Sequence, residues 1–147
     1  MLSPDFREFI QSLNDNDVRY LVVGGYAVAL HGYPRYTKDI DIWVESSQDN
    51  AVKLLKALEE FGFGSVGLKL DDFLEPDQVV QLGYPPNRID LLTSLAGVEF
   101  QDCYGAKMAV SIEGLVVNFI DIENLKKNKK ASGRLQDLAD VENLGGD

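Results

Sequence analysis

The chain has 147 residues, 45% of them hydrophobic, which is enough for one compact domain with a buried core. Its 24 acidic and 14 basic side chains give a formal net charge of −10, which disfavours an extended nucleic-acid surface. A nucleoside triphosphate remains compatible with this charge, because divalent cations can bridge carboxylates to phosphates. We expect a single domain over residues 1–147, with helices over 121–144 packed on it.

The single cysteine, Cys103, cannot form an intramolecular disulfide, and no Cys/His spacing resembles a zinc site. The first ten residues lack the basic and apolar regions of a signal peptide. No apolar run approaches the roughly 20 residues that are needed to span a bilayer. A cytoplasmic protein without a membrane partner is therefore expected.

The first elements show clear periodic patterns. Ser3 and Pro4 are typical of a helix start, and apolar residues then recur at helical spacing up to the polar segment over 14–17. The apolar, β-branched run over 18–23 indicates a buried strand that ends at a Gly-Gly turn. A short helix is expected over 26–30, because Gly32 and a proline at position 34 follow it.

The segment Asp39-Ile40-Asp41-Ile42-Trp43-Val44 alternates acidic and apolar residues before its apolar end, which predicts a strand with one face in the core. Both aspartates therefore lie on the other face, about 7 Å apart along the chain. A helix is expected from Ser46 or Ser47 to Gly62, and the segment over 64–77 favours a loop or short edge elements.

Paired strands dominate the second half of the chain. Strands are expected over 79–82 and 88–92 as a hairpin, and over 106–112 and 115–120 around the two-residue turn Glu113-Gly114. Helical composition returns over 122–144, with a break near Ser132-Gly133. This order predicts an α+β fold, a mixed sheet with flanking helices.

Three aspartates form the candidate chemical centre. Asp39 and Asp41 share one strand face, and Asp90 lies in a later apolar strand that would complete a three-carboxylate cluster. Such clusters hold the two Mg²⁺ ions that activate an attacking oxygen and neutralise a leaving pyrophosphate, and Mn²⁺ can replace Mg²⁺. An Asp-x-Asp pair alone equally fits a solvated strand face, so the argument depends on the combination with Asp90 and the Gly-Gly turn.

Two further features bear on phosphate binding. Gly24-Gly25 between a strand and a helix leaves main-chain N–H groups open to phosphate oxygens. The basic cluster Lys126, Lys127, Lys129 and Lys130 fits either a solvated helix end or a contact with nucleotide. His31 is expected to be a packing residue.

The sequence LVVGGYAVALHGYPRYTKDIDIWV, followed later by RIDLL, resembles the DNA polymerase β-type nucleotidyltransferase superfamily. The resemblance is greatest to small bacterial members with an Arg-x-Thr-x-Asp-Ile-Asp segment, among them abortive-infection and toxin–antitoxin-like proteins. It extends to the Lys-rich tail with an Arg-x-x-Asp-x-x-Asp pattern that begins at Arg134.

The resemblance implies a nucleotidyltransferase fold and assigns roles to residues. Asp39 and Asp41 would ligate both metal ions, and Asp90 would ligate one and help to deprotonate the acceptor. The implied nucleotide-binding residues are Gly24, Gly25, Arg35, Thr37, Lys38, Lys130 and Arg134.

The expected activity is Mg²⁺-dependent transfer of a nucleoside monophosphate from a triphosphate to a hydroxyl of an RNA, a protein or a small molecule. Two alternatives stay open: a catalytically idle interaction module of a toxin–antitoxin-like pair, and an antibiotic-modifying nucleotidyltransferase. Besides the triphosphate and the hydroxyl acceptor, a protein partner or a homodimer is expected, because the chain carries no large helical acceptor domain.

Overall fold

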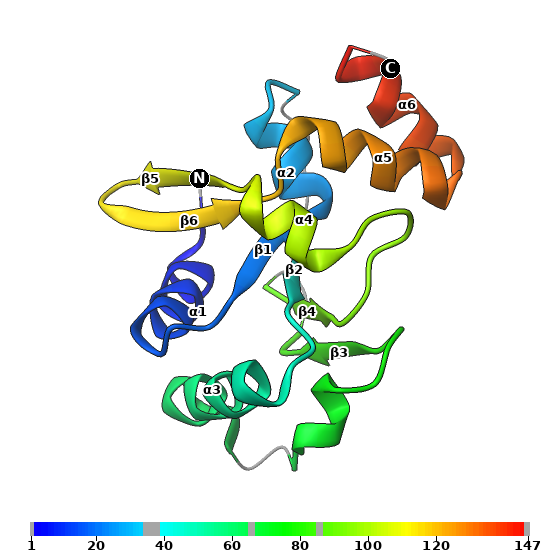
Figure 1. Cartoon of the computed structure of the whole chain (residues 1–147). Coiled ribbons are helices and arrows are strands. Elements are labelled where there is room, and N and C mark those ends of the chain that lie inside the picture. Colours follow the sequence, from blue (N-terminus) through cyan, green and yellow to red (C-terminus); the bar gives the residue numbers. More distant parts are fainter. Residues whose placement is uncertain (1, 34–38, 65–66, 85–86, 146–147) are drawn as a thin grey trace.

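The computed structural model describes residues 2–33, 39–64, 67–84 and 87–145 (Figure 1). Its centre is a six-stranded mixed sheet with the strand order β3-β4-β2-β1-β6-β5. The strands are β1 (Tyr20–Val23), β2 (Ile40–Val44), β3 (Val79–Leu82), β4 (Ile89–Leu92), β5 (Met108–Ile112) and β6 (Leu115–Phe119). This mixed sheet with flanking helices confirms the predicted α+β fold.

The helices pack around this sheet. They are α1 (Pro4–Asp15), α2 (Gly24–Leu30), α3 (Gln48–Leu58), α4 (Phe100–Gly105), α5 (Ile122–Ser132) and α6 (Leu135–Asn143). Figure 1 shows α2, α5 and α6 grouped at one end of the molecule, whereas α1 and α3 lie towards the other. None of the helices in the described ranges is both long and apolar enough to cross a membrane.

The N-terminal elements follow the sequence pattern closely. The Ser3 hydroxyl caps α1 by accepting a hydrogen bond from the Phe6 N–H (3.2 Å), as a serine before a helical proline predicts. All four apolar positions that recur at helical spacing in α1 are buried. Every residue of β1 is buried as well, so this strand runs through the middle of the core.

Trp43 and His31 contribute to packing. The Trp43 ring is 2% exposed and meets Phe100 edge to face, with 5.1 Å between ring centroids. His31 ends α2, and its Nε2 lies 2.9 Å from the Ile120 carbonyl oxygen. These contacts give Trp43 and His31 a role in stabilising the fold.

Some elements differ from the sequence prediction. Helix α2 begins at Gly24 rather than at residue 26, directly after β1. The segment expected to be a loop contains the 3-10 turn Leu70–Phe73, whose Phe73 side chain is buried. Helix α4 was not predicted, because six residues give too few apolar repeats for a helical period to be recognised.

Both predicted hairpins are present. Strands β3 and β4 pair antiparallel, and so do β5 and β6. The turn between β5 and β6 consists of Glu113 (φ 52°) and Gly114 (φ 85°), and two positive φ angles match the right-handed twist of the strands. Residues 85 and 86, between the strands of the first hairpin, lie outside the described residues.

A buried asparagine joins α3 to the centre of the sheet. Asn50 is 2% exposed, and its side-chain amide donates hydrogen bonds to the carbonyl oxygens of Arg19 and Glu45, each at 3.0 Å. Its Oδ1 accepts a hydrogen bond from the Arg19 N–H at 2.7 Å. One side chain thus satisfies main-chain groups at the start of β1 and at the end of β2.

We predict that Asn50→Ala lowers the free energy of unfolding by about 3 kcal/mol, because it removes three hydrogen bonds to main-chain groups, of which the Arg19 carbonyl oxygen alone keeps a second donor, the Glu45 N–H. Urea unfolding followed by circular dichroism measures this loss. The matched control is Asp49→Ala, which removes an exposed side chain from the same helix turn and should cost less than about 1 kcal/mol. Equal losses in the two variants would contradict this account of Asn50.

Candidate active site

Strand pairing brings two of the three predicted acids together. Strands β2 and β4 are parallel neighbours, and the register places Asp41 directly beside Asp90. Asp90 is only 8% exposed, and Asp41 is partly buried. On its other side, β2 pairs with β1 so that Asp41 lies opposite Val23, immediately before the Gly-Gly turn. The acids and the glycines therefore meet at one end of the central strands.

The proximity of these carboxyl groups changes their acidity. Burial, followed by the negative charge of Asp90, raises the pKa of Asp41 to about 6. The positive charge of Lys129 acts in the opposite direction on the same group. Negative charge is thus concentrated beside Asp41 in a partly dehydrated place, which favours the binding of a cation.

Asp39 takes a different position in the site. It lies just before β2, and its carboxylate forms an ion pair with Arg88 at 2.8 Å. The same guanidinium binds Asp90, with its Nε 3.0 Å from Oδ1 and its second nitrogen 3.2 Å from Oδ2. Arg88 therefore bridges the two acids that flank Asp41, a contact that the sequence prediction did not include.

A cleft of about 520 Å³ opens over Asp41 and Asp90. Its walls include Gly24 and Gly25 on one side and Asn128, Lys129 and Arg134 from the C-terminal segment. Val79, Leu92 and Leu95 add apolar surface. The cleft thus combines acids, main-chain N–H groups, cations and apolar side chains, as a binding site for an organic phosphate would require.

Gly24 is required by its surroundings as well as by its backbone. Its φ of +68° is a conformation that L side chains rarely adopt, and an added Cβ would collide with the Asp41 carboxylate. The closeness of Gly24 and Asp41 keeps the turn directly against the acid. A side chain at this position would fill the space beside the carboxylate.

Buried ion pairs hold the basic wall of the cleft. Lys129 is 5% exposed, and its ammonium lies 3.1 Å from Asp137 and 3.4 Å from Asp140, both of which are 1% exposed. Arg134 binds Asp137 at 2.7 Å from the solvent side. Burial tends to raise the pKa of Asp137, but hydrogen bonds from Arg134 and Lys129 hold it below its usual value. These pairs tie α6 to α5 and fix Lys129 towards Asp41.

The predicted nucleotide-binding residues fall into three groups. Gly24, Gly25 and Arg134 line the cleft. Lys130 is exposed and lies outside this lining, whereas its neighbour Lys129 contributes to it. Arg35, Thr37 and Lys38 lie outside the described residues. The spacing of the Arg-x-x-Asp-x-x-Asp pattern could have indicated Lys129, since two buried acids need a buried cation.

The three acids do not form a ready-made cage for a metal ion. Among the residues that the structure describes, no group of three or more His, Cys, Asp or Glu side chains is arranged to hold one. Arg88 accounts for this, because its guanidinium draws Asp39 and Asp90 to itself. Asp41 and Asp90 are the pair whose position and charge fit a hard cation.

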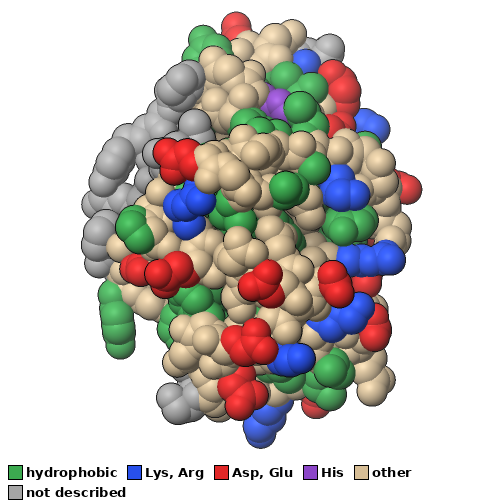
Figure 2. Space-filling view, turned by 90° about the vertical axis from the view of Figure 1, so that its left-hand side faces the viewer, with side chains coloured by type: hydrophobic (Ala, Val, Ile, Leu, Met, Phe, Trp, Pro, Cys, Tyr) green, Lys and Arg blue, Asp and Glu red, His purple; other side chains and the backbone are tan. Residues whose placement is uncertain are grey.

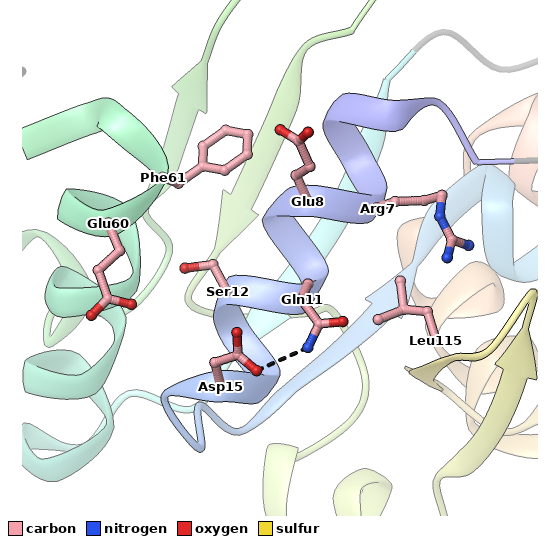
Figure 3. A pocket seen from close by; sticks show the side chains of 8 residues that line it. All are labelled: Arg7, Glu8, Gln11, Ser12, Asp15, Glu60, Phe61 and Leu115. Carbon is pink, nitrogen blue, oxygen red and sulfur yellow. Dashed lines mark hydrogen bonds between the residues drawn. The ribbon is translucent and has the colours of Figure 1, made fainter.

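A second hollow, of about 490 Å³, lies along α1 and is lined mostly by polar and charged side chains (Figure 3). Figure 3 shows Glu8, Ser12 and Asp15 on α1, facing Glu60 and Phe61 from the turn that follows α3. A hydrogen bond of 2.8 Å joins Gln11 to Asp15 within α1. This hollow contains none of the three predicted acids, so the cleft over Asp41 remains the candidate active site.

The fold is that of nucleotidyltransferases. A presumed nucleotidyltransferase from Thermotoga maritima aligns with a TM-score of 0.63 and 19% identity over 98% of this chain and 92% of that one. An antigenic nucleotidyltransferase-like protein from Paracoccidioides brasiliensis gives 0.55 and 19% over 97% of this chain and 75% of that one. ANT(2″)-Ia in complex with adenylyl-2″-tobramycin gives 0.51 and 14% over 82% and 70%.

The sequence belongs to the family described as "Nucleotidyltransferase of unknown function (DUF6036)", whose model matches residues 4–145. A search of curated protein sequences finds no match. The predicted membership of the nucleotidyltransferase superfamily is thereby confirmed.

We predict that Gly24→Ala destabilises the protein by about 2–4 kcal/mol, from the strained backbone together with the collision with Asp41. Gly133→Ala is the matched control, because Gly133 has a φ of +71° but its Cβ would meet only the Lys130 carbonyl oxygen at 3.9 Å. The control should therefore show the backbone cost alone, about 1–2 kcal/mol. Thermal unfolding compares the two, and a loss in Gly24→Ala no larger than in Gly133→Ala would refute the close contact.

Proposed function

We propose that the protein transfers a nucleoside monophosphate from a triphosphate to a hydroxyl acceptor with the help of Mg²⁺. The observation that carries this proposal is the register that sets Asp41 beside Asp90 under a cleft walled by Gly24, Lys129 and Arg134. Nucleotidyl transfer needs a cation site next to a phosphate site, and the acids and the Gly-Gly turn that line this cleft are the residue types that would supply them. Membership of a nucleotidyltransferase family supports the same reaction class.

The proposed cation ligands are Asp41 and Asp90, with Asp39 as the third. Burial and mutual repulsion destabilise the ionised forms of Asp41 and Asp90 unless a positive charge lies between them. When bound, Mg²⁺ would activate the acceptor oxygen and neutralise charge on the departing pyrophosphate. Asp90 is the proposed acceptor of the hydroxyl proton, because it lies at the floor of the cleft.

The proposed phosphate site faces these acids across the cleft. The N–H groups of Gly24 and Gly25 lie where β1 enters α2, and both glycines line the cleft. Lys129 and Arg134 add positive charge from α5 and from the residue before α6. Because Lys129 is fixed by buried acids, its charge would be placed before any substrate binds, and no ordering cost would be added.

The chemical nature of the acceptor is a separate question. The ligand name adenylyl-2″-tobramycin describes an adenylyl group joined to a small molecule in the complex of ANT(2″)-Ia. That protein shares only 14% identity with this chain, so the likeness supports a reaction type and not a substrate. RNA, a protein and a small molecule all remain candidate acceptors.

We predict that wild-type protein binds at least one nucleoside triphosphate in a Mg²⁺-dependent manner, and that Asp41→Asn weakens this binding about a hundredfold or more. Isothermal titration with each triphosphate, with and without Mg²⁺, measures the effect. The variant should remain folded, because asparagine has the same shape and removes the repulsion with Asp90. Asp102→Asn, which changes an exposed acid on α4, should bind like wild type.

If no triphosphate binds to the folded wild-type protein, the transferase proposal fails. The alternative of a catalytically idle interaction module would then be favoured, and stoichiometric binding of a protein partner would be the next measurement. A binding affinity of Asp41→Asn equal to wild type would also overturn the assignment of the cation site.

Arg88 gives a second prediction, because it competes with a cation for Asp39 and Asp90. We expect Arg88→Gln to bind Mn²⁺ about three- to tenfold more tightly than wild type, measured by the loss of free Mn²⁺ signal in electron paramagnetic resonance. Arg19→Gln is the control, since it removes an ion pair with Glu45 at 3.4 Å that lies outside the cleft. Weaker Mn²⁺ binding in Arg88→Gln would show that Arg88 organises the acids for the ion.

A further inference from the structure

Strand β5 lies at one edge of the sheet, and no other strand among the described residues pairs with its outer side. It pairs only with β6 in the sheet order, and Figure 1 shows the β5–β6 hairpin projecting from one side of the molecule. Ala109 and Ser111 are exposed, and the strand Met108–Ile112 contains neither a charged side chain nor a proline. An edge with these properties is open to pairing with another strand.

The hairpin register determines which main-chain groups face outwards. Ile112 and Leu115 flank the two-residue turn, so they form a hydrogen-bonded pair, and Val110 with Val117 forms the next one. Main-chain groups alternate along a strand, so those of Ala109 and Ser111 point away from β6. These are the groups that a further strand would engage.

We propose that β5 pairs antiparallel with β5 of a second copy of this chain, with Val110 on the two-fold axis. In this register Ala109 faces Ser111 of the partner subunit, and each such pair exchanges both of its main-chain hydrogen bonds. If Ala109 or Ser111 lay on the axis instead, only that residue would pair its outward main-chain groups within both strands. The other outward-facing residue would lie opposite a residue beyond the end of the partner strand. The two sheets would join into one continuous sheet across the dimer.

Charge complementarity favours a second copy as the occupant. With Val110 on the axis, Lys107 just before β5 lies opposite Glu113 of the partner subunit, and the reverse pair forms at the other end. Lys107 now lies over the Tyr104 ring at 4.1 Å, and Glu113 meets Arg7 at 3.5 Å with 70% of its side chain exposed. Both charges stand at the ends of the paired segment and remain accessible to a partner.

The side chains on one face of β5 fit the same pairing. Met108 is 43% exposed, and Val110 and Ile112 are half-buried against the core. In the proposed register Met108 faces Ile112 of the partner subunit, and the two Val110 side chains meet at the axis, where a non-hydrogen-bonded pair brings side chains closest. Figure 2, which looks onto the side of the molecule where β5 lies in Figure 1, shows acidic and basic side chains interspersed with hydrophobic ones.

Reversed charges test the register directly. Lys107→Glu sets two carboxylates against each other, because the new side chain lies opposite Glu113 of the partner subunit. Glu113→Lys creates the corresponding pair of lysines, so each variant alone should dimerise at least about tenfold more weakly than wild type. In an equimolar mixture of the two variants, a heterodimer pairs the introduced glutamate with the introduced lysine at one end and the original Glu113 with the original Lys107 at the other, so it should form about as well as the wild-type dimer.

A homodimer allows the same test without mixing two chains. The simpler test is therefore the double variant Lys107→Glu, Glu113→Lys, in which both facing pairs are opposite in sign within a homodimer. It should dimerise about as well as wild type. Sedimentation equilibrium up to about 200 µM, at physiological salt, measures all of these masses against the 16.3 kDa monomer.

Ala109→Pro is a second, independent variant. Proline removes an N–H that faces solvent in the monomer, so the fold should persist, but the intermolecular ladder should be lost. Circular dichroism checks the fold of every variant. A wild-type protein that stays monomeric at all concentrations, or a double charge variant that stays monomeric while wild type dimerises, would overturn the proposal.

Discussion

Two neighbouring parallel strands place two carboxylates side by side, and most of the candidate site follows from that placement. Hydrogen bonding between β2 and β4 fixes Asp41 next to Asp90, although the two negative charges repel each other in a partly buried place. The sheet tolerates this repulsion because the surrounding strands are buried and well packed. The site therefore holds unfavourable charge that a bound cation would relieve.

Three different cationic groups approach that charge from separate parts of the chain. Arg88 precedes β4 and reaches across to Asp39, whereas Lys129 comes from α5 and Arg134 from the residue before α6. The cations are themselves held by acids, since Asp137 and Asp140 enclose Lys129. A charge network of this kind links the sheet to the C-terminal helices, and the loss of one member would leave others buried and unpaired.

The sequence predicted most of the fold because its patterns were strong. The alternation through Asp39 and Asp41, the apolar run of β1 and the Glu113-Gly114 turn each identified their elements. Short or irregular elements such as α4 were missed, since they lack enough repeats for a period. The bridge by Arg88 could not be predicted, because it depends on a strand pairing between residues far apart in the chain.

The order of elements along the chain also has a consequence for biosynthesis. Helices α5 and α6 follow all six strands, so a chain emerging from the ribosome presents its acids and its Gly-Gly turn before Lys129 and Arg134 have been made. The positive wall of the cleft is assembled last. A nascent or truncated chain would therefore carry Asp41 and Asp90 without Lys129 and Arg134, and the cleft would be complete only once α5 and α6 had folded onto the sheet.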